Sequence, residues 1–327
     1  MAKITVLGTG GWGLALALSA RNSGNSVIMW SAFQEEIDNL KKNRCNDKLL
    51  PGICIPDDIE LSSEISVAAN SEVTIIAVPS FAVSSVATKL ADVKKHGIVV
   101  SVSKGFEPKT NRRLSEVISE KLPDDQIVVL SGPSHAEEVA RNIPTSLVAA
   151  STSLVAASII QDLLSSESLR IYTSDDIIGV EIGGALKNVI AVCAGICDGL
   201  GLGDNTKAAL ITRGLSEITR IGVMMGANER TFSGMAGIGD LVVTCTSVHS
   251  RNCRFGKLVG QGADIDEALN EVGTVEGYYA AAIAKKLSKK YKVSLPLIDE
   301  CYRVLYKGRD VSQVVRSLML RPKHSEY

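Results

Sequence analysis

The chain has 327 residues, of which 45% are hydrophobic and 22% are charged, and its formal net charge at pH 7 is −1. This length accommodates two domains of ordinary size, and the composition is that of a globular, soluble protein. The near-neutral charge and an aromatic content of 4% give no reason to expect nucleic acid or an anionic membrane surface as a general partner.

The cysteines and histidines show no metal-binding spacing. The seven cysteines contain no C-x-x-C pair, and the four histidines are scattered and do not cluster with them. We therefore expect reduced thiols in a cytoplasmic protein and no metal site. The N-terminal sequence MAKITVLG enters a strand pattern at once, so we expect no signal peptide.

The first half of the chain alternates β-rich runs with helical segments. Strands are predicted over residues 4–8, 26–30, 73–79, 98–105, 126–132, 145–151 and 169–174. Helices are predicted over residues 12–22 and 80–93 and in most of the other intervals. Continuous apolar strands separated by helices predict a parallel sheet that is covered on both faces.

The strand signal fades near residue 175. Beyond it, helices are predicted over residues 176–196, 206–226, 262–270, 277–290 and 296–306, joined by glycine-bearing loops. The sequence therefore predicts an α/β domain over residues 1–178 and an all-helical C-terminal domain over residues 179–327.

The segment GTGGWG follows the first predicted strand and opens the first predicted helix. Gly8, Gly10 and Gly13 have the spacing G-x-G-x-x-G, which permits a tight turn, close approach of the backbone to a pyrophosphate, and close helix–strand packing. The N-terminus of the helix adds free N–H groups and the positive end of a helix dipole. In this context the motif predicts a Rossmann-like, doubly wound sheet that binds a dinucleotide.

The end of the second strand does not carry the acidic residue that commonly binds the ribose of NAD. The chain has Trp30, Ser31 and Ala32 there, and the next acids, Glu35 and Glu36, are expected to lie too far along. These residues leave the choice between NAD and NADP open.

A lysine lies within a long apolar run. From residue 177 to residue 196 the polar side chains are Glu181, Lys187 and Asn188, and they favour a buried helix over a membrane span. A buried ammonium group is costly without a partner, and the alternative is a lysine that reaches the surface at the helix edge. At the start of the second domain, Lys187 would point into the cleft between the domains, where cofactors commonly bind.

Two polar segments follow predicted strands. VSKGFEP places Lys104 past the fourth strand, and SGPSHAEE places Gly132 and Ser134 past the fifth, at the edge where open α/β sheets bind ligands. Taken singly, each segment also fits an ordinary solvated loop.

The segment GMAGIGDLVVTCTSVHSRN carries a third group of polar residues. Asp240 is expected to follow a flexible glycine loop and to precede an apolar turn. Arg251 and Asn252 are adjacent and suit a phosphate, especially with the hydroxyl of Ser250 nearby. An ordinary surface loop is the alternative, and His249 is interpreted as a surface or packing residue.

Together, G-x-G-x-x-G near residue 8, SKG, GPS-x-A-x-E, GGALKN, GxGD-x-x-x-T, SRN-x-x-FG and VEG resemble the soluble NAD(P)-dependent glycerol-3-phosphate dehydrogenases of the bacterial type. The resemblance runs from residue 4 to about residue 310 in the order and spacing of the family. It implies reversible reduction of dihydroxyacetone phosphate to sn-glycerol 3-phosphate with NADH or NADPH, which supplies phospholipid synthesis. It also implies a cytoplasmic enzyme, a homodimer and no stable membrane insertion.

The resemblance assigns roles to individual residues. Lys187 is implied to be the general acid/base, and Lys104 a second active-site lysine that orients substrate and cofactor. Asp240 and Thr244 are implied to hold the catalytic lysine and the substrate. The other residues implied to bind the substrate are Gly132, Ser134, Ser250, Arg251 and Asn252. Those implied to contact the cofactor are Gly8, Gly10, Gly11, Trp12, Gly13, Lys104, Ala136, Arg251, Val275 and Glu276.

One departure and two alternatives accompany this interpretation. Many relatives carry a basic residue where this chain has Ala32, which puts a preference for NADP in doubt but not the reaction. Another two-domain Rossmann dehydrogenase, acting on a 3-hydroxy acid or on 6-phosphogluconate, would share the architecture. A dinucleotide-binding sensor without chemistry is the alternative from a different class.

Overall fold

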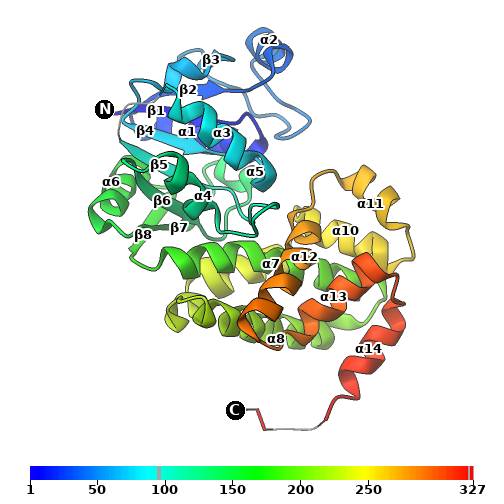
Figure 1. Ribbon diagram of the computed structural model, residues 1–327. Coiled ribbons are helices and arrows are strands. Elements are labelled where there is room, and N and C mark those ends of the chain that lie inside the picture. Colours follow the sequence, from blue (N-terminus) through cyan, green and yellow to red (C-terminus); the bar gives the residue numbers. More distant parts are fainter. Residues whose placement is uncertain (94–96, 323–324, 327) are drawn as a thin grey trace.

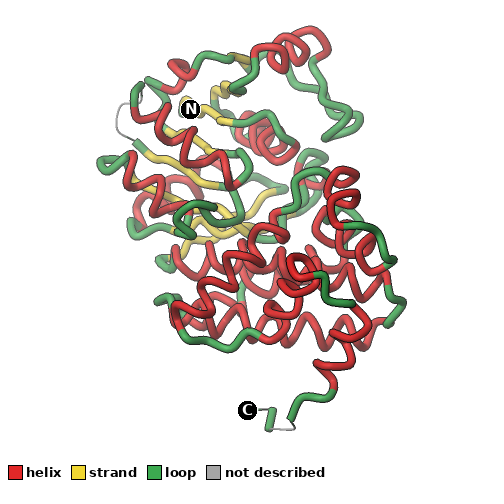
Figure 2. The backbone as a smooth tube through the Cα atoms, turned by 45° about the vertical axis from the view of Figure 1, so that its right-hand side comes forward, coloured by secondary structure: helices red, strands yellow, loops and turns green. Residues whose placement is uncertain are grey.

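The structure, a computed structural model, describes residues 1–93, 97–322 and 325–326. Within these residues the strands form one eight-stranded sheet in the order β3-β2-β1-β4-β5-β6-β7-β8, and the chain beyond β8 is helical (Figure 1). Figure 2 shows the same division, with the strands gathered in one part of the molecule and helices alone in the other. The strands are β1 (Lys3–Leu7), β2 (Ser26–Trp30), β3 (Glu60–Ser62), β4 (Val73–Ile76), β5 (Ile98–Ser101), β6 (Gln126–Ser131), β7 (Thr145–Ala150) and β8 (Leu169–Ser174).

The helices form two groups along the chain, those that lie between the strands and those that follow the last strand. Those within the sheet region are α1 (Gly11–Asn22), α2 (Gln34–Asn43), α3 (Val83–Ala91), α4 (Leu114–Lys121), α5 (Ala136–Val139) and α6 (Leu154–Leu164). Those that follow are α7 (Ile177–Gly199), α8 (Gly203–Met224), α9 (Asp240–Thr246), α10 (Arg251–Gly260), α11 (Ile265–Val272), α12 (Glu276–Tyr291), α13 (Pro296–Lys307) and α14 (Val311–Met319). Short 3-10 turns are η1 (Ile65–Ala68), η2 (Ser80–Ala82) and η3 (Glu229–Ser233), and η4 (Met235–Gly239) is a π-helical turn.

The strands are apolar on both faces because helices cover both. Val6 of β1 and Ile75 of β4 lie in the core shared with α1 and α6. Leu7 and Ile76, the next residue on each strand, lie in the core shared with α3 and α4. The strand order from β3 to β6 is the Rossmann order, and the prediction of a Rossmann-like sheet followed by helices is confirmed.

The sheet departs from parallel pairing at one position. Strand β7 pairs antiparallel with β6, with Leu130 opposite Ala149, and β8 is parallel to β7. Between β6 and β7 the chain forms only the four-residue helix α5, which is too short to cross a face of the sheet. The chain therefore turns back at the edge where β6 ends, a reversal that the predicted parallel sheet did not include.

Helix α7 is the central helix of the C-terminal part, with α8, α10 and α12 packed around it. Its length and composition would allow it to cross a membrane, but 83% of its most apolar window is buried within the fold. A Cβ at Gly195 would lie 2.0 Å from the carbonyl oxygen of Cys253, and one at Gly256 would lie 2.0 Å from that of Val192. Helices α7 and α10 therefore meet backbone to backbone, which brings the N-terminus of α10 beside the middle of α7.

Several predicted boundaries differ from the structure. The strands predicted to reach residues 79 and 105 end at Ile76 and Ser101, because the residues that follow leave the sheet as loops at its carboxyl edge. The flexible glycine loop expected before Asp240 is instead the turn η4, which runs directly into α9. Strand β3 and helices α10 and α14 were not predicted.

Candidate active site

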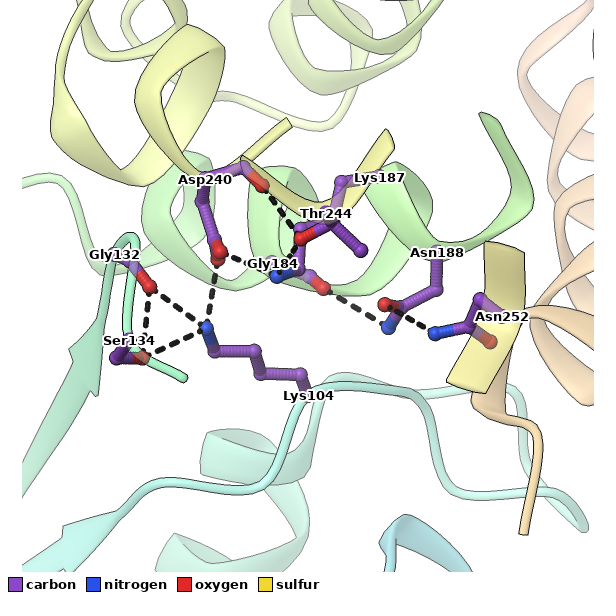
Figure 3. Close-up of polar contacts among 9 residues, drawn as sticks. All are labelled: Lys104, Gly132, Ser134, Gly184, Lys187, Asn188, Asp240, Thr244 and Asn252. Atoms are coloured by element: carbon purple, nitrogen blue, oxygen red, sulfur yellow. Dashed lines mark hydrogen bonds and ion pairs between the residues drawn. The ribbon is translucent and has the colours of Figure 1, made fainter. Parts of the chain in front are cut away.

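The carboxyl edge of the sheet faces the middle of α7 (Figure 3). Lys104 lies three residues beyond Ser101, the end of β5, and Gly132 directly follows β6. A Cβ at Gly184 of α7 would lie 2.9 Å from Ser131 Oγ and 3.6 Å from Lys104 Cγ. The glycine therefore allows α7 to lie against this edge, and Lys187 is one helical turn further on.

A single carboxylate binds both lysines. Lys104 Nζ donates to Asp240 Oδ2 at 2.8 Å, and Lys187 Nζ donates to the other oxygen, Oδ1. Asp240 is fully buried and Lys187 is only 6% exposed. Because one carboxylate cannot balance two ammonium groups, the site carries an excess of positive charge when both lysines are protonated.

The charges around Lys187 adjust its acidity. Burial lowers the pKa of Lys187 from 10.5 to about 7; the charge of Asp240 opposes this shift and that of Lys104 adds to it. A lysine with this pKa can both release and accept a proton near neutral pH. The alternative of a lysine that reaches the surface is wrong, because the side chain is buried and its ammonium group is bonded to Asp240.

Backbone and hydroxyl groups hold the two lysines in place. Lys104 Nζ also donates to the carbonyl oxygen of Gly132 at 2.9 Å and lies 3.4 Å from Ser134 Oγ. Lys187 Nζ donates to Thr244 Oγ1 at 2.7 Å, and that hydroxyl donates to the carbonyl oxygen of Asp240 at 2.6 Å. The two ammonium groups are thereby fixed at defined points of the same cluster.

A second chain of hydrogen bonds runs from α7 to the start of α10. Asn252 Nδ2 donates to Asn188 Oδ1 at 3.0 Å (Figure 3). Gly277 N donates to Asn252 Oδ1 at 2.8 Å. The amide of Asn252 is thus oriented by α7 and α12 together. Asn188 was noted as a polar residue in the apolar run but was given no role, and its contact with Asn252 supplies one.

The N-terminus of α10 offers groups that suit an anion. Ser250 caps the helix, and its Oγ accepts from Cys253 N at 3.2 Å, which leaves its O–H free to donate. Arg251 is exposed and forms no hydrogen bond or ion pair with any described residue. The helix N-terminus itself attracts negative charge, so the segment predicted from SRN has the features of a phosphate site.

The glycine loop after β1 has the shape that a pyrophosphate needs. Gly8 has φ +132°, and a Cβ there would lie 2.3 Å from the carbonyl oxygen of Ala77. A Cβ at Gly13 would lie 2.3 Å from the Gly8 carbonyl oxygen, whereas one at Gly10 would meet nothing within 4 Å. Loop and helix are therefore tightly packed on one side and open at Gly10. Trp12 Nε1 is buried without a hydrogen-bond partner among the described residues.

The other predicted cofactor contacts border this loop or the lysine cluster. The Ala136 Cβ lies 3.7 Å from where a Cβ of Gly11 would be. Glu276 accepts from Ser80 N at 2.9 Å and from Ser80 Oγ at 2.6 Å, and its carboxylate lies against Gly105, next to Lys104. Burial raises the pKa of Glu276, while the hydrogen bonds from Ser80 and the charge of Arg251 oppose that shift. Ser80 was not predicted, although it follows a buried strand as Lys104 does.

Val275 differs from the other predicted contacts. Its side chain is fully buried in the core of the helical part, where it packs with α7 and α12. Its backbone, at the N-terminus of α12, is the part of the residue that could touch a ligand.

Glu36 lies close to the end of β2. Ser31 Oγ donates to Glu36 Oε2, and Phe33 N donates to Ser31 Oγ at 3.3 Å. Glu36 lies in the first turn of α2, which folds it back toward the end of the strand. The expectation that both acids lie too far along is therefore wrong for Glu36, whose carboxylate reaches Ser31, the residue that follows β2.

No metal site accompanies these groups. In the described ranges, no three His, Cys, Asp or Glu side chains are grouped so as to hold a metal ion. His96 and His324 lie outside those ranges.

A Rossmann sheet with a dinucleotide-type glycine loop, joined to a helical part that contributes a buried lysine, defines a two-domain nicotinamide-dependent dehydrogenase. The family model described as NAD-dependent glycerol-3-phosphate dehydrogenase N-terminus matches residues 3–157, and its C-terminal counterpart matches residues 176–316. The chain belongs to this family. This confirms the resemblance found in the sequence motifs, and it also confirms that the protein uses NAD or NADP.

Several similar proteins are named glycerol-3-phosphate dehydrogenase, and they match this chain over nearly its whole length. The glycerol-3-phosphate dehydrogenase (NAD(P)+) of Desulfitobacterium hafniense strain Y51 is 47% identical over 328 residues, with 100% of this chain and 93% of that protein covered. The protein of the same name from Lysinibacillus sphaericus is 48% identical over 332 residues, with 100% and 98% covered. The crystal structure of glycerol-3-phosphate dehydrogenase from Coxiella burnetii matches with a TM-score of 0.94 at 36% identity, covering 98% of this chain and 99% of that one.

Proposed function

We propose that the chain reduces dihydroxyacetone phosphate to sn-glycerol 3-phosphate with NADH or NADPH, reversibly, and that Lys187 is the general acid/base. The observation that carries the proposal is the carboxylate of Asp240 between Lys104 and Lys187, at the same carboxyl edge of the sheet as the glycine loop. The family and the names of its relatives support the same reaction.

In this proposal a proton moves between Lys187 and the C2 oxygen of the substrate. A bound NADH or NADPH supplies the hydride to the carbonyl carbon C2. Lys187 donates its proton to the C2 oxygen as negative charge develops there, and takes the proton back in the reverse direction. Burial lowers the pKa of Lys187 to about 7, which suits both roles. The ammonium group of Lys104, held by the other oxygen of Asp240, stabilises the charge that develops.

The phosphate of the substrate is assigned to the start of α10. Arg251 has no partner within the described residues, Ser250 has a free O–H, and Asn252 is held by Asn188. These groups lie on the helix that packs against α7, so they hold the phosphate at a fixed distance from Lys187. This arrangement favours a phosphorylated three-carbon ketone over a 3-hydroxy acid, which has no phosphate to bind.

We infer a cytoplasmic enzyme that supplies phospholipid synthesis, which agrees with all seven cysteines being free thiols. We also propose that the protein is a homodimer, as the resemblance implies, and the mass of the protein in solution tests this.

The proposal is tested by the loss of nicotinamide absorbance when the protein is mixed with dihydroxyacetone phosphate and NADH or NADPH. Lys187→Ala is expected to bind the cofactor as the wild type does but to lose at least about 100-fold in turnover. A variant that keeps more than about a tenth of the wild-type rate would exclude the acid/base role. Reduction of NAD+ or NADP+ by a 3-hydroxy acid or by 6-phosphogluconate, without oxidation of NADH or NADPH by dihydroxyacetone phosphate, would favour the rival dehydrogenases. Cofactor binding without turnover of any of these would favour the sensor.

A further inference from the structure

The end of β2 borders the glycine loop. Leu7 of β1 is in register with Trp30 of β2, and Gly8 N donates to the Trp30 carbonyl oxygen at 2.8 Å. Gly8 and Ser31 therefore leave the sheet side by side. In a Rossmann sheet a dinucleotide whose pyrophosphate lies on the glycine loop extends its adenosine ribose over the end of the second strand.

Two neighbouring residues, Ser31 and Ile37, hold Glu36 near the end of β2. Ser31 is 4% exposed and donates to Glu36 Oε2, so one carboxylate oxygen is fixed and the other remains available as an acceptor. Glu36 is half-buried, forms no ion pair with any described residue, and is followed by Ile37, which is fully buried in the sheet core. The side chain is therefore anchored on both sides.

The segment that leads from β2 into α2 offers no cation to a phosphate before the last turn of α2. Ala32 occupies the position after Ser31, and the first basic residues that follow are Lys41 and Lys42, in the last turn of α2. A ribose 2′-hydroxyl can donate a hydrogen bond to a carboxylate, whereas a 2′-phosphate would face a carboxylate of the same charge.

We propose that Glu36, positioned by Ser31, selects NAD(H) over NADP(H) in this chain by accepting a hydrogen bond from the ribose 2′-hydroxyl and repelling a 2′-phosphate. The inference rests on the proposed binding of a dinucleotide at the glycine loop. It does not depend on the identity of the substrate that is reduced.

The test measures binding without turnover. Dissociation constants for NADH and NADPH are determined by titrating the fluorescence of the reduced nicotinamide in the absence of substrate. The wild type is expected to bind NADH more tightly. Glu36→Gln is expected to lower the NADH/NADPH selectivity by roughly 10–100-fold, since a hydrogen bond to a charged group and a repulsion are both lost. Ser31→Ala is expected to lower it by a smaller factor, because the carboxylate remains but is no longer held.

Glu35 provides the matched control. It lies in the same first turn of α2 and carries the same charge, but it is exposed and makes no contact with Ser31. Glu35→Gln is expected to leave the selectivity within about twofold, a limit that separates it from the loss of a charged hydrogen bond. Equal effects of the two variants would show that the charge of the helix end, not Glu36 itself, sets the preference, and would overturn the proposal.

The outcomes also separate this proposal from the proposed reaction. Tighter binding of NADPH by the wild type, or unchanged selectivity in Glu36→Gln, overturns the role of Glu36 even if dihydroxyacetone phosphate is reduced. Selective NADH binding that Glu36→Gln abolishes supports that role even if dihydroxyacetone phosphate is not reduced. Failure of the wild type to bind either cofactor overturns both.

Discussion

Glu181 and Lys187 are both buried on α7, 8% and 6% exposed, yet they face different surroundings. Glu181 accepts from Ser115 N at 2.8 Å and from Arg113 Nη1 at 2.6 Å, so its charge is paired and its oxygens are occupied. Lys187 shares Asp240 with a second lysine and lies at the sheet edge where ligands bind. Glu181 therefore joins α7 to the start of α4, whereas Lys187 is the buried charge that we propose takes part in the reaction.

This contrast predicts opposite effects on stability. Glu181→Ala should lower the free energy of unfolding by about 2 to 3 kcal/mol, because the buried N–H and hydroxyl of Ser115 lose their acceptor and Arg113 keeps only Glu116 as a carboxylate partner. Lys187→Met should change it by less than about 1 kcal/mol or raise it, because Asp240 keeps Lys104 and a costly buried charge is removed. Urea unfolding of both variants measures the difference, and a larger loss for Lys187→Met would contradict the assignment of the two charges.

The pKa of Lys187 predicts opposite pH profiles in the two directions. Reduction needs the protonated lysine, so its kcat/KM should be level below pH of about 7 and should decline above it. Oxidation of glycerol 3-phosphate needs the neutral lysine, so its kcat/KM should rise up to the same pH and then level off. Initial rates from pH 5.5 to 9, a range spanning about two units around this pKa, check both limbs. Parallel profiles in the two directions would exclude a shared acid/base with this pKa.

Removing the carboxylate between the lysines should shift that profile. The charge of Asp240 raises the pKa of Lys187, so Asp240→Asn should move the inflection to lower pH and reduce kcat by about 100-fold or more. Thr244→Val removes one hydrogen bond to Lys187 without removing a charge and serves as the matched comparison. The inflection should move further in Asp240→Asn than in Thr244→Val, and the reverse order would show that the hydroxyl, not the charge, sets the acidity.

The close contact of α7 and α10 predicts an effect on substrate binding. A methyl group in Gly256→Ala would lie 2.0 Å from the carbonyl oxygen of Val192, so α10 must move away from α7. Ser250 and Arg251 would move with it, and the KM for dihydroxyacetone phosphate should rise about tenfold or more, the loss expected when a charge-assisted contact is misplaced. Lys257→Ala, an exposed neighbour on α10, should leave KM unchanged. Equal KM values for Gly256→Ala and the wild type would place the phosphate elsewhere.

Features set by the local order of residues could be predicted from the sequence. The alternation of apolar runs and helical periods indicated the sheet, the glycine spacing indicated the loop after β1, and the single lysine in an apolar run indicated Lys187. Each of these depends on the physics of a short segment: backbone freedom at glycine, burial of apolar side chains, and the cost of a buried charge. The adjacent Arg251 and Asn252 also indicated a phosphate site, whereas the roles of Asp240 and Thr244 came from the motif resemblance.

The tertiary structure determines the contacts between segments that are distant in the sequence. Asp240 lies 136 residues from Lys104 and 53 from Lys187, and only the folded chain brings its two oxygens to both. The reversal of β7 depends on a connection that stays at one edge of the sheet, and the approach of Glu36 to Ser31 depends on how α2 leaves β2. Sequence order determines which residues can form a strand, a helix or a turn, because those preferences act within a few residues. Which charges meet is determined by packing across the whole molecule, since the interactions that fix it are long-range and are made only when the cores have formed.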